Sequence, residues 1–177
     1  MGSKNNKILK GSTRPLSVEI KLNFLNKTKF KISKNFFEKS FFTSIKKLRI
    51  PQPALLELYL VSQNEIKKIN SKWHAKLSPT DVISFEITDK NTETYPKILN
   101  KKGLSEYLDP SFWGIIFLCP DYIKTHAKEA GLQFKEYLLW AFIHGIIHCA
   151  GYDHEKSSQE EKLMKRLEKQ ILNKESL

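Results

Sequence analysis

Three of the five histidines in this 177-residue chain lie within one short segment, from His144 to His154. His144 and His148 are four residues apart, so a helix places their side chains on one face, about 6 Å from each other. Gly151 stands where a helix often ends in a left-handed residue, after which the chain can turn back and deliver His154. Three neutral imidazoles and an open fourth position are typical of a catalytic zinc site, because structural sites are closed by four ligands. We therefore expect one Zn²⁺ per chain at these three histidines. The simpler alternative is a buried helix whose histidines only form hydrogen bonds in the core.

The spacing from His148 to His154 also occurs in metzincin proteases. Those enzymes need a glutamate directly after the first histidine as general base, and here Gly145 holds that position. They also carry a methionine turn beyond the third ligand, whereas Met164 belongs to an apolar helical stripe. Peptidase chemistry is therefore disfavoured. A metal-bound water can ionise near neutral pH without a carboxylate base, which suits phosphodiester cleavage.

Asp153 lies directly before the third histidine. Its carboxylate could accept a hydrogen bond from a ligating histidine and orient it. It could equally stabilise the turn between Tyr152 and His154, because aspartate side chains often bond to nearby backbone. Both interpretations stay open from the sequence.

The segment His144–His154 reads H-G-I-I-H-C-A-G-Y-D-H and closely resembles the H-G-x-x-H-x-x-G-Y-D-H signature of the YbeY endoribonuclease family. A second similarity lies upstream, where Ile69-Asn70 and Trp73 lead into P-T-D-V-I-S-F at residues 79–85. This run looks like the family's L-N-x-x-[YW]-R and P-T-D-V-L-S-F segments. The resemblance covers residues 55–173 and includes the order of the expected elements.

The resemblance implies a metal-dependent endoribonuclease specific for single-stranded RNA. Such proteins take part in ribosomal RNA maturation, notably at the 3′ end of the small-subunit RNA, and in ribosome quality control. It also implies that His144, His148 and His154 are the metal ligands, act through a metal-bound water, and usually hold zinc. The expected partners are single-stranded RNA, ribosomal RNA and the ribosome, with no DNA and no membrane.

Two positions depart from the family pattern. His74 stands where the family usually has an arginine facing the pocket, so we treat His74 as a further candidate catalytic residue. Lys72 or Lys76 could supply the missing charge, although only as a point charge. Ile115 follows Gly114 where the family tends to have an aspartate. These departures leave a second possibility open, a non-catalytic ribosome-assembly factor in which zinc mainly stabilises the fold.

The composition agrees with an anionic partner and an intracellular setting. Lysine and arginine outnumber aspartate and glutamate by 30 to 19, which gives a formal net charge of +11. That excess indicates a nucleic-acid partner, although a lysine-rich genome would produce the same charge. The two cysteines, Cys119 and Cys149, are far apart and no disulfide is needed in a chain of this length. No apolar run reaches membrane-spanning length and the N-terminus has no signal-peptide core, so we expect a cytoplasmic protein.

The elements that must position the histidines follow from hydrophobic periodicity. Strict alternation over residues 16–24 predicts a strand, and apolar residues spaced for one face predict a helix up to Leu48. Ser62 and Glu65 form a predicted capping box. The remaining expected elements are strands at Leu55–Val61, Val82–Ile87 and Phe112–Leu118, and helices after Ser62, from Pro120 to Gly131, at Phe134–Ala150 and from Ser157 or Ser158 onward.

The order β-α-β-α-β-β-α-α-α predicts an α+β fold, a four-stranded sheet covered by helices. The metal site would lie on a central helix in a zincin-like three-histidine arrangement. We expect a flexible basic tail at residues 1–14 and a single metal-dependent endoribonuclease domain at residues 15–177. Residues 88–111 are polar and carry two prolines, which indicates a long surface excursion.

Overall fold

The computed structural model describes residues 19–87 and 112–173. Within them the order of elements is the predicted one, and the α+β class is confirmed. The expected tail at 1–14 and the excursion at 88–111 lie outside the described residues. The elements are β1 (Ile20–Asn26), α1 (Asn35–Leu48), β2 (Ala54–Leu60), α2 (Gln63–His74), β3 (Val82–Glu86), β4 (Phe112–Leu118), α4 (Pro120–Glu129), α5 (Phe134–Cys149) and α6 (Ser158–Leu172).

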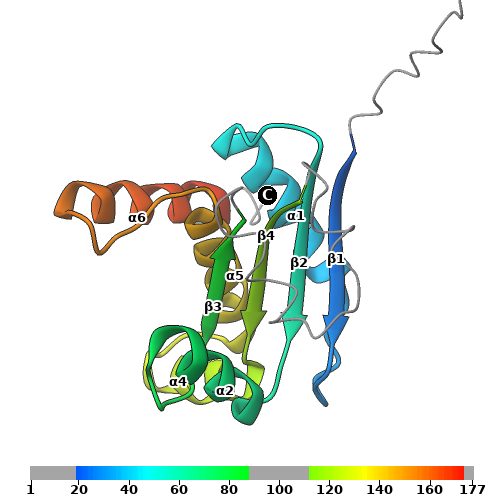
Figure 1. Cartoon of the computed structure of the whole chain (residues 1–177), viewed down its shortest axis with the longest axis vertical. Helices are drawn as coiled ribbons and strands as arrows, with labels where there is room; N and C mark the ends of the chain where they lie inside the picture. The colour runs from blue at the N-terminus through cyan, green and yellow to red at the C-terminus, as the bar shows by residue number, and fades with distance from the viewer. Residues whose placement is uncertain (1–18, 88–111, 174–177) are drawn as a thin grey trace, which may run out of the picture.

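The four strands form one sheet in the order β1-β2-β4-β3 (Figure 1). β1, β2 and β4 are parallel, and β3 is antiparallel to β4 and borders the sheet opposite β1. β1 runs two residues further than predicted because Asn26 still pairs with Leu60. Its expected start at residues 16–18 lies outside the described residues. β2 lies inside the sheet between β1 and β4, and this explains its nearly continuous apolar sequence.

Helices pack on both faces of the sheet. α1 and α5 cover one face, where alternate β2 residues such as Leu56 and Leu58 meet Phe37 and Phe142 in a fully buried cluster. On the other face, Ile66 of α2 packs with residues of the opposite parity in β2 and β4. Because successive side chains of a strand point to opposite faces of the sheet, the same strands contribute residues to two separate hydrophobic cores.

The helices α2, α4 and α6 begin at the capping residues and the proline that the sequence indicates. The capping box at Ser62 and Glu65 is present, with the serine hydroxyl accepting a bond from the Glu65 backbone. Pro120 occupies the first turn of α4, where its missing N–H costs nothing. Ser157 accepts a bond from the Glu160 backbone and starts α6. These caps settle where the helices begin.

The central helix α5 contacts β3, β4, α1, α4 and α6. Gly145 lies on its sheet-facing side. A Cβ atom there would lie 3.2 Å from Ile116 side-chain atoms and 3.3 Å from Val82. The absence of a side chain therefore allows α5 to approach the sheet closely, at the place where the helix carries its histidines. In the described ranges, no helix combines the length and apolarity that crossing a bilayer requires.

Candidate metal centre and cleft

His144 and His148 lie on the last two turns of α5, and a short turn brings His154 to them. Gly151 has φ +86°, the left-handed conformation that glycine adopts without strain. Its N–H donates to the His148 carbonyl at 2.9 Å, and the Tyr152 N–H donates to the Ile147 carbonyl at 3.3 Å. These bonds close the helix and reverse the chain, as the glycine spacing predicted.

The three imidazoles are arranged so that they can share one ion. One ring nitrogen of each histidine lies within 4.8 Å of the other two. The Nε2 atoms of His144 and His148 are 3.1 Å apart. Two nitrogens on a tetrahedral zinc, each about 2.0–2.1 Å from the ion, would be separated by about 3.3 Å. The donor set therefore fits Zn²⁺, although nitrogen ligands also suit other transition metals.

The surroundings of His148 favour its neutral form. Burial lowers the pKa of the His148 imidazole, and the proximity of His144 and His154 lowers it further, while the Asp153 carboxylate acts weakly in the opposite direction. A neutral ring offers the lone pair that a metal requires. His148 is therefore able to offer a nitrogen lone pair to a metal at neutral pH.

The sequence did not reveal two residues that contact His144. A Glu168 carboxylate oxygen lies 2.7 Å from Nδ1 of His144, and the other accepts a bond from Trp140 Nε1 at 3.1 Å. The Trp140 ring also stacks on His144, with ring centroids 5.1 Å apart. For both residues the sequence contains a feature that could have indicated the contact. Trp140 precedes His144 by one helical spacing of four residues, and Glu168 interrupts the apolar face of α6.

Asp153 stabilises the turn. Its Oδ1 accepts a bond from the Glu155 N–H at 2.9 Å, and this bond is the main reason that the pKa of Asp153 is lowered. Its own N–H donates to Glu160 of α6 at 3.1 Å. The structure supports the turn-forming interpretation, and Glu168 makes the carboxylate contact to a histidine.

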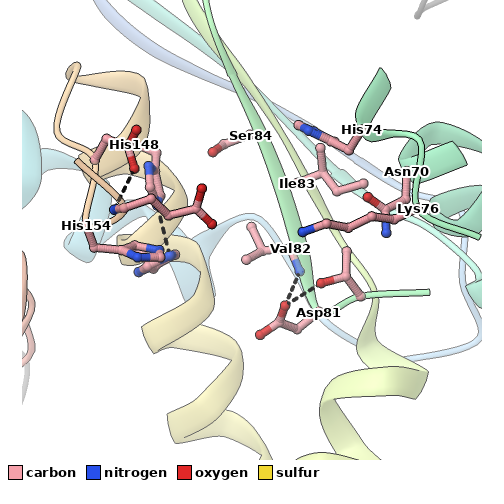
Figure 2. A pocket seen from close by; sticks show the side chains of 13 residues that line it. Asn70, His74, Lys76, Asp81, Val82, Ile83, Ser84, His148 and His154 are labelled. Atoms are coloured by element: carbon pink, nitrogen blue, oxygen red, sulfur yellow. Dashed lines mark hydrogen bonds between the residues drawn. The ribbon is translucent and has the colours of Figure 1, made fainter. Parts of the chain in front are cut away.

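A cleft of about 410 Å³ lies against the three histidines. Figure 2 shows His148 and His154 at one side of it and His74 and Lys76 at the other. Strand β3 runs between the two sides and contributes Ser84 to the lining. The cleft thus combines a possible metal site with a wall of polar and basic side chains, as a site for an anionic substrate would.

Of the two lysines considered from the sequence, Lys72 and Lys76, only Lys76 lines the cleft, on the side opposite the histidines. Lys76 lines the cleft and directs its ammonium group into it (Figure 2). The Lys72 ammonium lies 4.9 Å from the ring centre of Trp73, and Lys72 lines a separate hollow on α2. His74 is exposed at the end of α2, lines the cleft, and stacks on Phe85 with ring centroids 6.0 Å apart.

Two other positions from the sequence motifs have structural roles. Asp81 lines the cleft but does not belong to the histidine group, and its carboxylate accepts bonds from the Val82 N–H at 2.8 Å and the Tyr137 hydroxyl at 3.1 Å. These bonds fasten the start of β3 to α5. Ile115 is fully buried in the core between β4 and α2, so this departure from the family pattern lies outside the cleft.

The fold and site together define an α+β protein of zincin-like type, with two helical histidines and a third beyond a glycine turn. A sequence profile for the family "Endoribonuclease YbeY" matches residues 19–176. The endoribonuclease YbeY of Persephonella marina is 32% identical over 140 residues, which is 79% of this chain and 82% of that protein. That of Francisella philomiragia is 32% identical over 154 residues, covering 86% and 89% of the two chains.

A solved structure agrees with these sequence matches. The solution structure of TM1509 from Thermotoga maritima superimposes with a TM-score of 0.53 and 26% sequence identity, covering 85% of this chain and 86% of that one. The chain therefore belongs to the endoribonuclease YbeY family. The match begins further upstream than the motif resemblance, which started at residue 55, and so includes β1 and α1.

Proposed function

We propose that this endoribonuclease holds Zn²⁺ at His144, His148 and His154 and cleaves single-stranded RNA during ribosomal RNA maturation, including the 3′ end of the small-subunit RNA, and in ribosome quality control. The observation that carries the proposal is the convergence of three imidazole nitrogens at a cleft with a basic far wall. Ribosomal RNA and the ribosome would be its partners, and the cytoplasm its location.

The chemistry that such an ion supplies when bound is a water with a pKa of about 7 and a polarised phosphoryl oxygen. Lys76 can bind a substrate phosphate from the opposite wall as a point charge. His74 offers an exposed ring beside it, which could contact either phosphate or base. The net charge of +11 favours the approach of a polyanion.

Peptidase activity is disfavoured by the surroundings of Gly145. The general base of metzincin proteases occupies that position. In this chain a Cβ atom at position 145 would lie 3.2 Å from Ile116 and 3.3 Å from Val82. A glutamate side chain there would therefore collide with the sheet. A peptidase would need another base.

The experiment that tests the proposal combines metal analysis with RNA cleavage, for the wild type and His148→Ala. We expect about one zinc per chain and cleavage of a single-stranded RNA, with both lost in the variant. A 2′,3′-cyclic phosphate on the product would identify the ribose 2′-hydroxyl as nucleophile and predict that DNA is not cleaved. Cleavage that persists undiminished in His148→Ala would refute a catalytic metal at these histidines.

A non-catalytic assembly factor is the second candidate. It is favoured by His74, since the family's usual arginine would clamp a phosphate with two hydrogen bonds and remain charged at every physiological pH. In that case the metal would raise thermal stability and the chain would bind RNA, while highly purified protein would leave the RNA intact.

A further inference from the structure

Glu168 is a buried acid on a helix that otherwise contributes apolar residues to the core. It is 8% exposed and lies on the same face as the buried residues Met164, Leu167 and Ile171. Burial of a carboxylate is costly unless hydrogen bonds compensate it. Here both carboxylate oxygens have partners, His144 Nδ1 at 2.7 Å and Trp140 Nε1 at 3.1 Å.

The contact at 2.7 Å determines which nitrogen of His144 carries the proton. An ionised carboxylate can only accept hydrogen bonds, so beside an ionised Glu168 it is Nδ1 of His144 that carries the proton and donates. In a neutral imidazole the other nitrogen, Nε2, then has the free lone pair. That atom lies 3.1 Å from Nε2 of His148, on the side where the three histidines converge. The distance to Glu168 is that of a charge-assisted hydrogen bond.

Trp140 holds the carboxylate from the other side. Its indole N–H can only donate, so it occupies the second oxygen of Glu168 and prevents the carboxylate from turning away. Its ring stacks on His144 at an interplanar angle of 30°, which limits tilting of the imidazole. The ring orientation of His144 is therefore constrained by two contacts from two different helices.

We infer that Glu168, held by Trp140, is a positioning residue of the metal centre: it selects the His144 tautomer whose Nε2 lone pair faces the metal site. The inference rests on the proposed metal site. It extends that site to α6, which contributes none of the three histidines. The effect reaches the metal only through His144, so Glu168 need not touch substrate.

The first test reads the tautomer in the metal-free protein, by two-bond ¹H–¹⁵N correlation spectra of the imidazole rings above pH 7. The wild type should show His144 protonated at Nδ1. Glu168→Met, which keeps the side-chain length and replaces the carboxylate by a weakly accepting thioether, should shift His144 toward the Nε2–H form. A merely structural role would leave the tautomer unchanged, and an unchanged tautomer in a folded Glu168→Met variant would overturn the inference.

The second test measures Zn²⁺ affinity by competition with a chelator. Loss of such a hydrogen-bond partner typically weakens metal binding by about 10–100-fold, and we expect this for Glu168→Met. Glu168→Gln should fall between that variant and the wild type, because His144 and Trp140 approach different oxygens of Glu168 and the amide NH₂ that replaces one of them cannot accept a hydrogen bond. Glu129→Gln is the control for loss of an acid, since Glu129 is exposed at the end of α4 and does not line the cleft, and its affinity should equal the wild type.

The two tests separate failure of this inference from failure of the proposed function. If the wild type binds no Zn²⁺, the proposed metal site is wrong, whatever the tautomer spectra show. If the wild type binds Zn²⁺ and Glu168→Met binds it within about twofold, the metal site stands and the positioning role is refuted. Glu168→Gln provides a nearly isosteric variant should Glu168→Met fail to fold.

Discussion

At the scale of single residues, the protonation of His148 is linked to both stability and metal binding. Burial lowers the pKa of His148 in the folded chain below its value in the unfolded chain. Below about pH 6.5 the unfolded state therefore binds more protons than the folded state, and acid favours unfolding. The same protons compete with a metal for the ring nitrogens, so acid also weakens metal binding.

We accordingly expect the metal-free protein to lose thermal stability between about pH 8 and about pH 5.5. His148→Gln removes the titrating ring, so the melting temperature of this variant should fall less over the same interval. Thermal unfolding of both chelator-treated proteins at the two pH values makes the comparison. An equal fall in both would show that His148 does not titrate differently in the folded and unfolded states.

The two lysines near the end of α2 give a matched pair of substitutions. Lys76 lines the cleft, whereas the Lys72 ammonium lies over Trp73 and faces another hollow. Lys76→Ala should weaken binding of a single-stranded RNA and lower the salt dependence of log K by about 0.7, the value for one phosphate contact. Lys72→Ala should change both much less, as measured by fluorescence anisotropy titration. Equal losses would mean that the lysines act only through net charge.

At the scale of elements, β3 is tied to α5 by the bond from Tyr137 to Asp81. Burial, followed by the neighbouring Asp81 charge, raises the pKa of Tyr137 to about 12. The folded state keeps the phenol proton between about pH 10 and pH 12 while the unfolded chain releases it, so this contribution to stability is lost as the pH rises through that interval.

Tyr137→Phe should therefore cost about 1 kcal/mol of unfolding free energy at neutral pH, the typical net value of one hydrogen bond. It should also reduce the alkaline loss of stability seen in the wild type. Urea unfolding at pH 7 and at about pH 11 measures both effects. A variant as stable as the wild type at both pH values would show that the bond does not secure β3.

The packing of α5 against the sheet depends on Gly145. Adding a Cβ there brings it to 3.2 Å from Ile116 and 3.3 Å from Val82, so these side chains or the helix must move. Overpacking a core costs about 1–3 kcal/mol, whereas replacing a helical glycine by alanine gains about 1 kcal/mol, so we expect Gly145→Ala to destabilise the fold by up to about 2 kcal/mol. Urea unfolding of the wild type and the variant measures this cost. A Gly145→Ala protein more stable than the wild type by the full gain of about 1 kcal/mol would show that the new methyl group meets no crowding at the sheet.

At the scale of the whole molecule, a metal ion at the three histidines would join α5 to the turn that leads into α6. His144 and His148 lie on α5, His154 lies beyond it, and Glu168 of α6 contacts His144. A ligand that binds only the folded state at 100 times its dissociation constant adds about 2.7 kcal/mol of stability.

Removal of the metal should consequently lower the melting temperature of the wild type by roughly 5–10 °C for a domain of this size. Thermal scans of zinc-loaded protein with and without chelator measure the shift. His148→Ala, which lacks one proposed ligand, should respond little to chelator. A wild type that melts at the same temperature in both conditions would speak against an ion that links these elements.

Much of the fold and the histidine cluster could be predicted from sequence because their causes are local. A spacing of four residues places His144 and His148 on one helix face whatever surrounds the helix. Gly151 is suited to the positive φ that reverses the chain toward His154. Strand alternation and the Ser62 capping box are likewise local, and the structure agrees with these predictions, although β1 extends to Asn26, two residues beyond its expected end.

Tertiary packing decided the rest. The contact of Glu168 with His144 joins residues 24 positions apart on different helices, and it exists only because α6 packs against α5. The side of the cleft opposite the histidines likewise depends on how α2 and β3 pack relative to α5. This packing places Lys76 in the cleft and Lys72 outside it. The sequence alone determined which side chains could hold a metal, since periodicity and turn chemistry act over a few residues. Only the folded structure decided which groups orient those side chains, because such contacts depend on packing between elements distant in the chain.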